Sequence, residues 1–564
     1  MSKNSMKLSW LVGVSMLAAL VPAHAFAQSA DPVEVAAEAQ DDGGEIIVTG
    51  SNICGAAPVG SPVIALTHDD ISAGGAVSTS QMLQQVPQVL NIGVSETSRG
   101  QAGGSGNPTY GTSINLRGLG PYSTLTIVNG QRVVPQGTTG QAPDPSTIPT
   151  LMLKRIDVMA DGASAVYGSE AIAGVVNLVL RRDLDGVEAS ARYGFADGYN
   201  ERLIGLAAGT SWSTGQITAA IEQGYHSNLP GIDRDFYASD LRSRGGGDFR
   251  ATQCAPGTLT IGGSTYAIPA GGVTQATAAQ LVAGTSNRCD NAKLGDLLPE
   301  QKHNSAAFTF DQRFGSSVRL FADGFYKERE FSFTPAPLTV NLTVPSTSPS
   351  FVRPAGATGT SGTVAYSFAD LLPANRVSGT SKSWNVTYGA EAELGAGFVV
   401  TLQGGYGKSI ERALSTGGLD TRSAAAGGVL NTAIANGSFN PFLANPGSVA
   451  SFATSVSDTR GGATLERYGA KIEGPLFELP GGTLRVAVGY ERQYLESRNG
   501  TFNNVPAATG YTVALRLFKR KVDSAYAEVL LPLIGADNNI PLMQRLDINV
   551  AGRFDHYSDI GAST

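Results

Sequence analysis

The chain has 564 residues, and 47 Asp and Glu residues slightly outnumber 40 Lys and Arg residues, so no basic surplus points to nucleic acid. Charged residues make up 15% of the chain, below the roughly 25% of average soluble proteins, while 70 Gly and 28 Pro residues exclude a long coiled coil. The near-average apolar share of 42% also excludes wholesale disorder. This composition predicts a turn-rich chain built mainly from β-strands.

Residues 1–27 have the plan of an export signal. Lys3 and Lys7 precede an apolar run from Leu8 to Val21, and the small residues around Ala27 form a cleavage site. A transmembrane anchor is the alternative, but a run of 14 residues is shorter than the roughly 20 that a bilayer requires. No later stretch has 18 uninterrupted apolar residues, so we exclude a helical membrane protein. A periplasmic protein, a secreted protein and an outer-membrane barrel remain.

Residues 28–60 are small and acidic at first, and they predict a flexible leader that has no core of its own. Inside this leader lies a short β-branched run. Taken alone, the run fits an ordinary edge strand equally well. It consists of Glu45, Ile46, Ile47, Val48, Thr49 and Gly50.

Residues 61–185 mix helical and extended patterns, with dense turn signals between them. We expect a small α+β domain here. The predicted helices cover residues 70–74, 80–83 and 164–173, and the predicted strands cover residues 113–117, 124–128 and 155–159.

From residue 186 onward, segments of about ten residues sort apolar and polar side chains onto opposite faces. This period of two is that of a strand, because successive side chains of a strand point to opposite faces. The clearest segment, residues 545–556, carries on one face Leu546, Ile548, Val550, Gly552, Phe554 and His556.

The links between these segments alternate between short and long. The long links, residues 227–303, 332–383, 412–463 and 497–515, are rich in Gly, Ser, Thr, Asn and Pro. Short turns at one end and long loops at the other are typical of an outer-membrane β-barrel. A soluble β-sandwich is the alternative, but a 77-residue loop is unusual in a compact soluble domain.

The chain has three cysteines, which fits an oxidising compartment. Cys254 and Cys289 share one Gly/Ser/Thr-rich segment, and we expect them to form a disulfide worth roughly 3–4 kcal/mol by loop entropy. The pairing of cysteines cannot be read from their spacing alone, so other pairings stay open. The Cys254–Cys289 pairing leaves Cys54 over.

The most specific motif of the chain runs from Arg155 through Gly162-Ala163-Ser164-Ala165-Val166-Tyr167-Gly168-Ser169 to Asn177, and residues 113–120 and 126–132 carry further motifs. These motifs resemble the plug motifs of TonB-dependent outer-membrane receptors. The resemblance implies that residues 45–50 are the TonB box, residues 61–185 a plug domain and residues 186–564 a barrel wall. It also implies a TonB-type periplasmic energy transducer as partner, which the box would join by adding a strand to a sheet edge.

In this family, plug arginines face barrel glutamates and latch the plug to the wall. The matching plug positions are Arg117 and Arg155, and we expect Glu491 and Glu528 to be their barrel partners. A solvated lumen charge is the alternative for each of the four.

The chain departs from the family in length. We expect about eleven strands after residue 186, whereas plugged barrels have about 22. An open sheet would leave unpaired edges in lipid. The sequence therefore predicts a truncated receptor whose barrel is incomplete, or one that another chain closes.

We find no catalytic or cofactor-binding pattern. The chain has no His-Glu-x-x-His, no complete phosphate-binding loop, no dinucleotide fingerprint and no Gly-x-Ser-x-Gly elbow. We therefore expect no enzyme, no metal site and no cofactor.

The resemblance implies energised uptake of a scarce, small extracellular ligand through the outer membrane of a Gram-negative bacterium, with the barrel surrounded by outer-membrane lipid. Siderophores, cobalamin and oligosaccharides all remain open as the ligand. A non-transporting structural or adhesin-like barrel, or an inactive fragment, is the alternative. The expected ligand-binding residues are Asn107, Tyr110, Tyr225 and His226.

Overall fold

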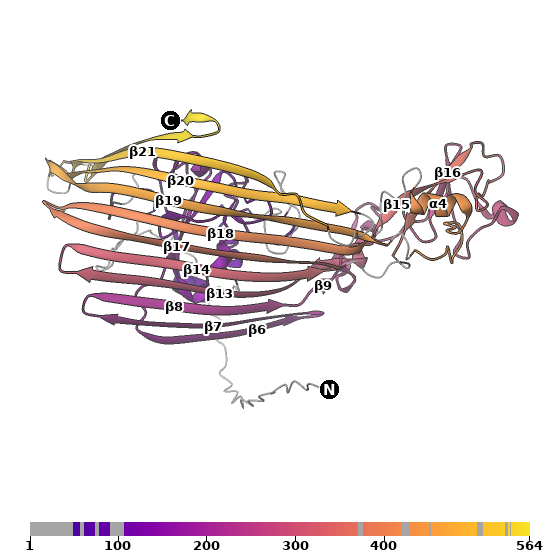
Figure 1. Ribbon diagram of the computed structural model, residues 1–564, viewed down its shortest axis with the longest axis horizontal. Helices are drawn as coiled ribbons and strands as arrows, with labels where there is room; N and C mark the ends of the chain where they lie inside the picture. Colours follow the sequence, from indigo (N-terminus) through magenta and orange to yellow (C-terminus); the bar gives the residue numbers. More distant parts are fainter. Residues whose placement is uncertain are drawn as a thin grey trace, which may run out of the picture. The chain divides into compact units, whose positions relative to one another are not determined.

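The computed structural model describes residues 49–56, 61–73, 78–90, 107–140, 142–369, 371, 376–418, 428–449, 453–504, 511–535, 538, 540, 541 and 543–563 (Figure 1). Ile46–Thr564 form one compact unit. Among the described residues, no helix has both the length and the apolar character needed to span a membrane.

A five-stranded mixed sheet forms the first part of this unit, as expected for a small α+β domain. Its strand order is β1-β4-β5-β2-β3, and β2 runs parallel to β5 while the other neighbours are antiparallel. The strands are β1 (Ile64–Thr67), β2 (Thr124–Val128), β3 (Gln131–Arg132), β4 (Leu153–Met159) and β5 (Gly174–Leu180). The helices are α1 (His68–Ala73), α2 (Thr79–Leu83) and α3 (Ser164–Tyr167), with 3₁₀ turns at Pro145–Thr147, Thr150–Met152 and Ser169–Ala171.

The core of this domain is centred on β4 and β5. Every residue of β5 is buried, which explains its nearly continuous apolar sequence. The same cluster of buried side chains continues into the long sheet through Ala207, Ala220, Ala307 and Phe325. Small alanine side chains let the plug backbone lie close to the wall, so plug and wall share one packed interior.

The predicted strand over residues 113–117 is wrong. Leu116 makes only an isolated bridge to Val89, and Arg117 has a φ of 54°, in the left-handed region that ends an extended segment. The predicted helix over residues 164–173 is shorter than expected, because Gly168, with a φ of 91°, ends α3 after one turn.

We expect Gly174→Ala to destabilise the plug by roughly 2–4 kcal/mol, the sum of backbone strain and overpacking. Gly174 has a φ of 132°, and a Cβ atom there would lie 2.2 Å from the carbonyl oxygen of Met159. Urea unfolding followed by hydrogen exchange of β4 and β5 measures the loss. Gly552→Ala is the matched control, because nothing lies within 4 Å of its added Cβ; equal stability losses in both variants would contradict the expectation.

Twelve strands form a single antiparallel sheet in the rest of the described chain (Figure 1), which confirms the expected fold class. Neighbours in sequence are neighbours in the sheet, apart from the long loops. The strands are β6 (Gly186–Ala196), β7 (Tyr199–Trp212), β8 (Gly215–His226), β13 (Glu300–Phe314), β14 (Val318–Phe333), β17 (Arg376–Gly395), β18 (Phe398–Gly418), β19 (Ser455–Leu479), β20 (Gly482–Asn504), β21 (Arg516–Ile534), β22 (Leu546–Tyr557) and β23 (Gly561–Ser563).

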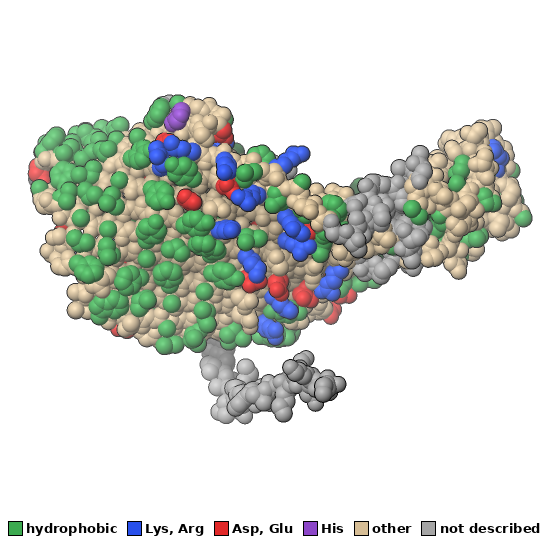
Figure 2. All heavy atoms as spheres, in the orientation of Figure 1, with side chains coloured by type: hydrophobic (Ala, Val, Ile, Leu, Met, Phe, Trp, Pro, Cys, Tyr) green, Lys and Arg blue, Asp and Glu red, His purple; other side chains and the backbone are tan. Residues whose placement is uncertain are grey.

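The two faces of this sheet differ as the alternating sequence predicts. On β17, the polar side chains of Ser383, Asn385 and Thr387 are buried, while Trp384 and Tyr388 on the opposite face are exposed. Figure 2 shows this second face, where hydrophobic side chains are spread widely over the strands. The sheet therefore has a polar inner face against the plug and an apolar outer face suited to lipid.

The strands reach further than the sequence predicts, so the long loops are shorter. The loops run over residues 227–299, 334–375, 419–454 and 505–515, because β17, β18, β19 and β20 extend into the segments expected to be loops. These extensions are rich in Gly, Ser, Thr and charged residues on both faces. Their polarity hides the period of two that marks a strand.

Three of the long loops combine into a small module with its own core. Its sheet has the order β11-β10-β16-β15, and Tyr366, Phe368, Phe439 and Phe442 are fully buried beside it. Its elements are β10 (Thr258–Ile261), β11 (Ser264–Ala267), β15 (Thr339–Pro345), β16 (Ser361–Ser367) and α4 (Val429–Asn436). Nearby loop segments form β9 (Leu229–Pro230), β12 (Asp296–Leu298) and 3₁₀ turns at Gly231–Asp233, Asp235–Tyr237, Arg242–Arg244, Gln275–Gln280 and Ala292–Leu294.

A disulfide joins Cys254 and Cys289 beside this module. The bridge closes a loop with a sequence separation of 35, so we expect Cys254→Ser/Cys289→Ser to lower the stability of the module by about 3–4 kcal/mol. Limited proteolysis of the full chain would show faster cleavage within residues 254–289. An unchanged cleavage rate at these sites would contradict the loop-entropy argument.

Candidate functional site

The first described residues anchor the leader to the centre of the plug sheet. Thr49 is buried; its Oγ1 donates to Asp157 Oδ2 at 2.8 Å and accepts from Asn177 Nδ2 at 3.0 Å. Asp157 and Asn177 are cross-strand partners on β4 and β5. The Gly50 N–H donates to the Tyr167 hydroxyl at 3.1 Å, and burial raises the pKa of Tyr167 to about 12, so this hydroxyl stays protonated near neutral pH. The leader is thus bonded to two plug strands and to α3.

The next residues are held by two buried carboxylates of the wall. Glu528 on β21 accepts from the Ser51 hydroxyl at 2.7 Å and from the Asn52 N–H at 2.6 Å. Glu473 on β19 accepts from the Cys54 N–H at 2.7 Å. Hydrogen bonds to an ionised carboxylate are shorter and stronger than neutral ones. We name residues 51–54, with the two glutamates, the wall clamp.

Two cations and one apolar contact complete the wall clamp. Lys471 Nζ donates to the carbonyl oxygen of Asn52 at 3.0 Å, and Arg485 donates to that of Cys54 at 2.9 Å. Ile53 is buried against apolar side chains of β20 and β21. The wall therefore both accepts from N–H groups of this short segment and donates to its carbonyl oxygens.

The predicted TonB box lies mostly outside the described residues, because Glu45, Ile46, Ile47 and Val48 are not described. Its last two residues, Thr49 and Gly50, are the plug-anchored ones. Residues 45–50 as a transducer-binding box stay a prediction.

The four residues of the predicted latch make other contacts. Arg117 donates to the carbonyl oxygen of Ala173, and Arg155 pairs with Asp157 at 2.9 Å, both within the plug. Glu491 pairs with Arg553 at 3.1 Å, whereas Glu528 belongs to the wall clamp. The family resemblance named Glu528 as a barrel glutamate of the latch, but not its partners Asn52 and Ser51, which lie 476 and 477 residues away.

Arg132 is a plug cation that the sequence analysis did not select. It lies in the motif of residues 126–132 and donates to Glu170 and to the carbonyl oxygen of Tyr167. The charges of Glu491 and Arg553 in the wall also act on its guanidinium group. Burial, followed by the nearby Arg553 charge, lowers the pKa of Arg132, while Glu491 opposes this shift.

A buried ion pair joins the other end of the plug to the wall. Asp144 accepts from Arg329 on β14 at 2.7 Å, and the side chains are only 2% and 3% exposed. Lys327, also on β14, donates to the carbonyl oxygen of Ser146. Burial alone would raise the pKa of Asp144, but Arg329 and Lys327 hold it below the usual range. In this pair the acidic residue belongs to the plug and the basic residue to the wall, whereas the predicted latch has plug arginines and wall glutamates.

Further polar contacts between plug and wall are spread over several strands. They share one pattern, in which a wall side chain from the inner face meets a plug backbone group or a short polar side chain. They include Thr150 with Glu222, Gly137 with Glu411, Asn129 with Asp323, Gln131 with Gln403, and Pro135 with Ser409.

Of the expected ligand residues in the plug, Tyr110 packs against the wall and Asn107 bonds within the plug. The Tyr110 ring lies 5.3 Å from each of Phe331 and Phe333, and only 5% of the residue is exposed. Asn107 exchanges hydrogen bonds with Gly111 and so fixes the turn that carries Tyr110. Their roles in ligand binding stay predictions.

The other two expected ligand residues lie at the end of β8 on opposite faces. Tyr225 shares the exposed outer face with Ile221 and lies under Arg202, whose guanidinium is 4.9 Å from the ring centre. His226 is on the inner face, with Nδ1 3.3 Å from the Ser227 carbonyl oxygen. The structure does not bring Tyr225 to the plug-facing side.

Among the described residues, no group of three or more His, Cys, Asp or Glu side chains is arranged to hold a metal ion.

A family model described as TonB-dependent Receptor Plug Domain matches residues 57–175. A ferric enterobactin receptor (PfeA) variant from Pseudomonas aeruginosa is similar in structure, with 15% identity, a TM-score of 0.50, and coverage of 89% of this chain and 58% of that one. The siderophore receptor PirA from Acinetobacter baumannii matches with 15% identity, a TM-score of 0.48, and coverage of 89% and 57%. The chain thus spans less than two thirds of the length of these structures. The family model shows that residues 57–175 match the plug domain of TonB-dependent receptors. The likeness to the ferric enterobactin receptor supports the fold, a small mixed-sheet domain followed by a twelve-stranded antiparallel sheet.

Proposed function

We propose that the chain takes up a small extracellular ligand across the outer membrane with energy delivered by a TonB-type periplasmic transducer. One observation carries this proposal. From the last two residues of the expected TonB box onward, the chain is bonded first to the plug sheet through Thr49 and then to the wall through Glu528 and Glu473.

This order of contacts suits mechanical coupling. Residues 45–48 are β-branched or extended in character, and such a segment binds by adding a strand to the edge of a partner's sheet. A pull on residue 48 then loads the bonds of Thr49 to Asp157 and Asn177. Because β4 and β5 are central in the plug sheet, the pull reaches the middle of the plug.

We place ferric siderophores first among the ligands to test. The similar structures named above are receptors for siderophores, and cobalamin and oligosaccharides follow as further probes. The family is one of transporters and receptors, so we propose no enzymatic step.

Deletion of residues 45–48 tests the proposal. The full chain and the deletion variant are expressed in a strain that lacks its own siderophore receptors, and uptake of iron-55 from a panel of ferric siderophores is measured. We expect the deletion to abolish uptake but to leave cell-surface ligand binding unchanged, because Thr49 and Gly50 keep their plug contacts.

A protonophore is the control for energy dependence. It should reduce uptake by the full chain to the level of the deletion variant. Uptake that neither the deletion nor the protonophore reduces would favour a passive barrel instead. A variant with Asp42→Asn, a leader acid outside the box, is the matched sequence control and should transport normally.

A further inference from the structure

A band of positive side chains crosses the outer face of the sheet. Figure 2 shows blue side chains in a diagonal row over the outer face, next to the region where hydrophobic side chains dominate. Six outward cations lie on the neighbouring strands β17 to β21, and we name them the outer basic ladder. Its members are Lys382, Lys408, Arg412, Arg460, Arg498 and Lys519.

The outer basic ladder begins where the apolar surface ends. On β17, the outward residues from Leu394 to Trp384 are apolar or aromatic, and Lys382 is the next outward residue toward the long loops. Ten residues of strand span about 34 Å, or roughly 26 Å across a membrane at a tilt near 40°. This height matches the apolar band of about 25 Å expected for outer-membrane barrels. The ladder therefore lies at the level of the lipid headgroups on the loop side.

Aromatic residues mark the same boundary. The rings of Trp384 and Tyr406 stack with centroids 5.0 Å apart on neighbouring strands, and Tyr326 is the cross-strand partner of Trp384. Rings of Trp and Tyr collect at the interface between hydrocarbon and headgroups.

The ladder has an excess of positive charge. Glu328 pairs with Lys382 at 2.6 Å, Asp458 pairs with Arg412 and Arg460, and Glu496 pairs with Arg498 and Lys519. Five of the six cations thus share three carboxylates. Arg412 and Arg460 are also directly opposite each other on β18 and β19, and the buried Asp458 carboxylate that pairs with both offsets one of their two charges.

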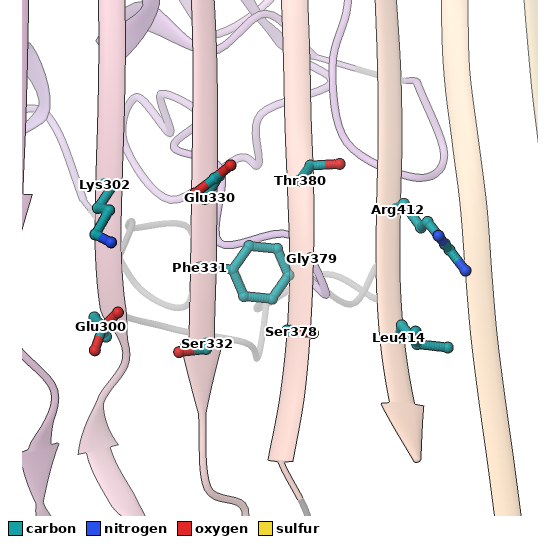
Figure 3. Close-up of a pocket in the computed structure, with 10 residues that line it drawn as sticks. All are labelled: Glu300, Lys302, Glu330, Phe331, Ser332, Ser378, Gly379, Thr380, Arg412 and Leu414. Carbon is teal, nitrogen blue, oxygen red and sulfur yellow. The ribbon is translucent and has the colours of Figure 1, made fainter. Parts of the chain in front are cut away.

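Two adjoining hollows provide room for a bound group. The first, of about 350 Å³, is lined by Lys302, Glu330, Arg412 and Leu414, which Figure 3 shows on neighbouring strands. The second, of about 490 Å³, is lined by Lys408, Ile410, Arg412, Arg460, Arg498 and Leu515. Each hollow combines cationic groups with an apolar side chain, and Arg412 lines both.

We propose that the outer basic ladder binds the phosphate groups of an anionic lipid in the outer leaflet. Its charge complements a phosphate, the hollows beside it combine cationic groups with apolar side chains, and its height is that of the headgroups. Guanidinium groups also bind phosphate through paired hydrogen bonds. This inference concerns the lipid-facing side and does not depend on the proposed transport.

Native mass spectrometry of the full chain in a neutral detergent tests the proposal. The probes are bis-phosphorylated lipid A, its dephosphorylated form and phosphatidylcholine. We expect only the phosphorylated lipid to remain bound at low lipid concentration, and Arg412→Gln/Arg460→Gln to weaken its binding roughly tenfold or more.

Matched variants separate charge from folding. Arg412→Lys/Arg460→Lys keeps the charge and should retain most of the affinity, whereas Arg242→Gln/Arg250→Gln, in a loop pair with Asp240 and Asp248, should leave it unchanged. Circular dichroism checks that each variant keeps its β-structure. Equal binding of phosphorylated and dephosphorylated lipid, or equal affinities of the Gln variant and the wild type, would overturn the proposal. Concentration-dependent pairing of the chain that the Gln variant abolishes, with no lipid bound, would show instead that a second copy covers this surface.

Discussion

Replacing Glu473 and Glu528 together by Gln is expected to free residues 51–54 from the wall. A Gln side chain has one oxygen where the carboxylate has two, yet Glu528 accepts bonds with both of its oxygens, from Ser51 and from Asn52. An amide NH₂ group would then face a donor. Loss of charged hydrogen bonds at the two sites should destabilise the wall clamp by roughly 2–4 kcal/mol.

The thiol of Cys54 reports this release directly, because it lies within the wall clamp and forms no disulfide. We expect maleimide to react with Cys54 about a hundredfold faster in the double variant, the change that about 2.7 kcal/mol would produce. Glu478→Gln, at a short turn where Glu478 accepts from Thr483, is the matched control and should not alter the rate. An unchanged rate in the double variant would show that the clamp glutamates do not hold the leader.

Replacing Arg329 by Met should loosen the opposite end of the plug by about 3–5 kcal/mol. The change removes one partner of a buried ion pair and leaves the Asp144 carboxylate without its main counter-charge. Urea unfolding, followed by a fluorophore attached to the plug, measures the loss. Adding Asp144→Asn to the same variant removes the remaining charge and should restore part of the stability.

The pH dependence gives this prediction a sign. In the wild type the pKa of Asp144 is below its usual value. The ionised carboxylate therefore adds to the free energy of unfolding at every pH above the usual pKa, and this contribution is lost as the pH falls through the lowered pKa. The Arg329→Met variant lacks this contribution. The stability difference between the two proteins should therefore shrink in acid, and a difference that grows with falling pH would contradict the assigned ion pair.

The sequence predicts those parts of the fold that depend on local pattern. The apolar alternation of residues 545–556 predicts β22, and residues 124–128 form β2 with the expected bounds. Between β7 and β21, short and long links also alternate as expected. Each of these features is decided by side-chain periodicity or turn chemistry within about ten residues.

Local side-chain patterns do not predict contacts between segments that are far apart in the sequence. Nothing near Glu528 in sequence indicates that its partners are Ser51 and Asn52, and nothing near Asp144 indicates Arg329. The loop module has the same origin, because its core is assembled from three loops that have little apolar periodicity alone. The ladder of outward cations could be seen in the sequence only after the strand register was known.

Pulling on the chain from residue 46, with the protein held in a lipid bilayer, tests the coupling account most directly. The account predicts that the first rupture breaks the bonds of residues 49–54 before any plug strand extends, and that Glu473→Gln/Glu528→Gln lowers this first rupture force. A first event that extends the plug sheet, with the same force in wild type and variant, would contradict the claim that this short segment transmits the pull to both plug and wall.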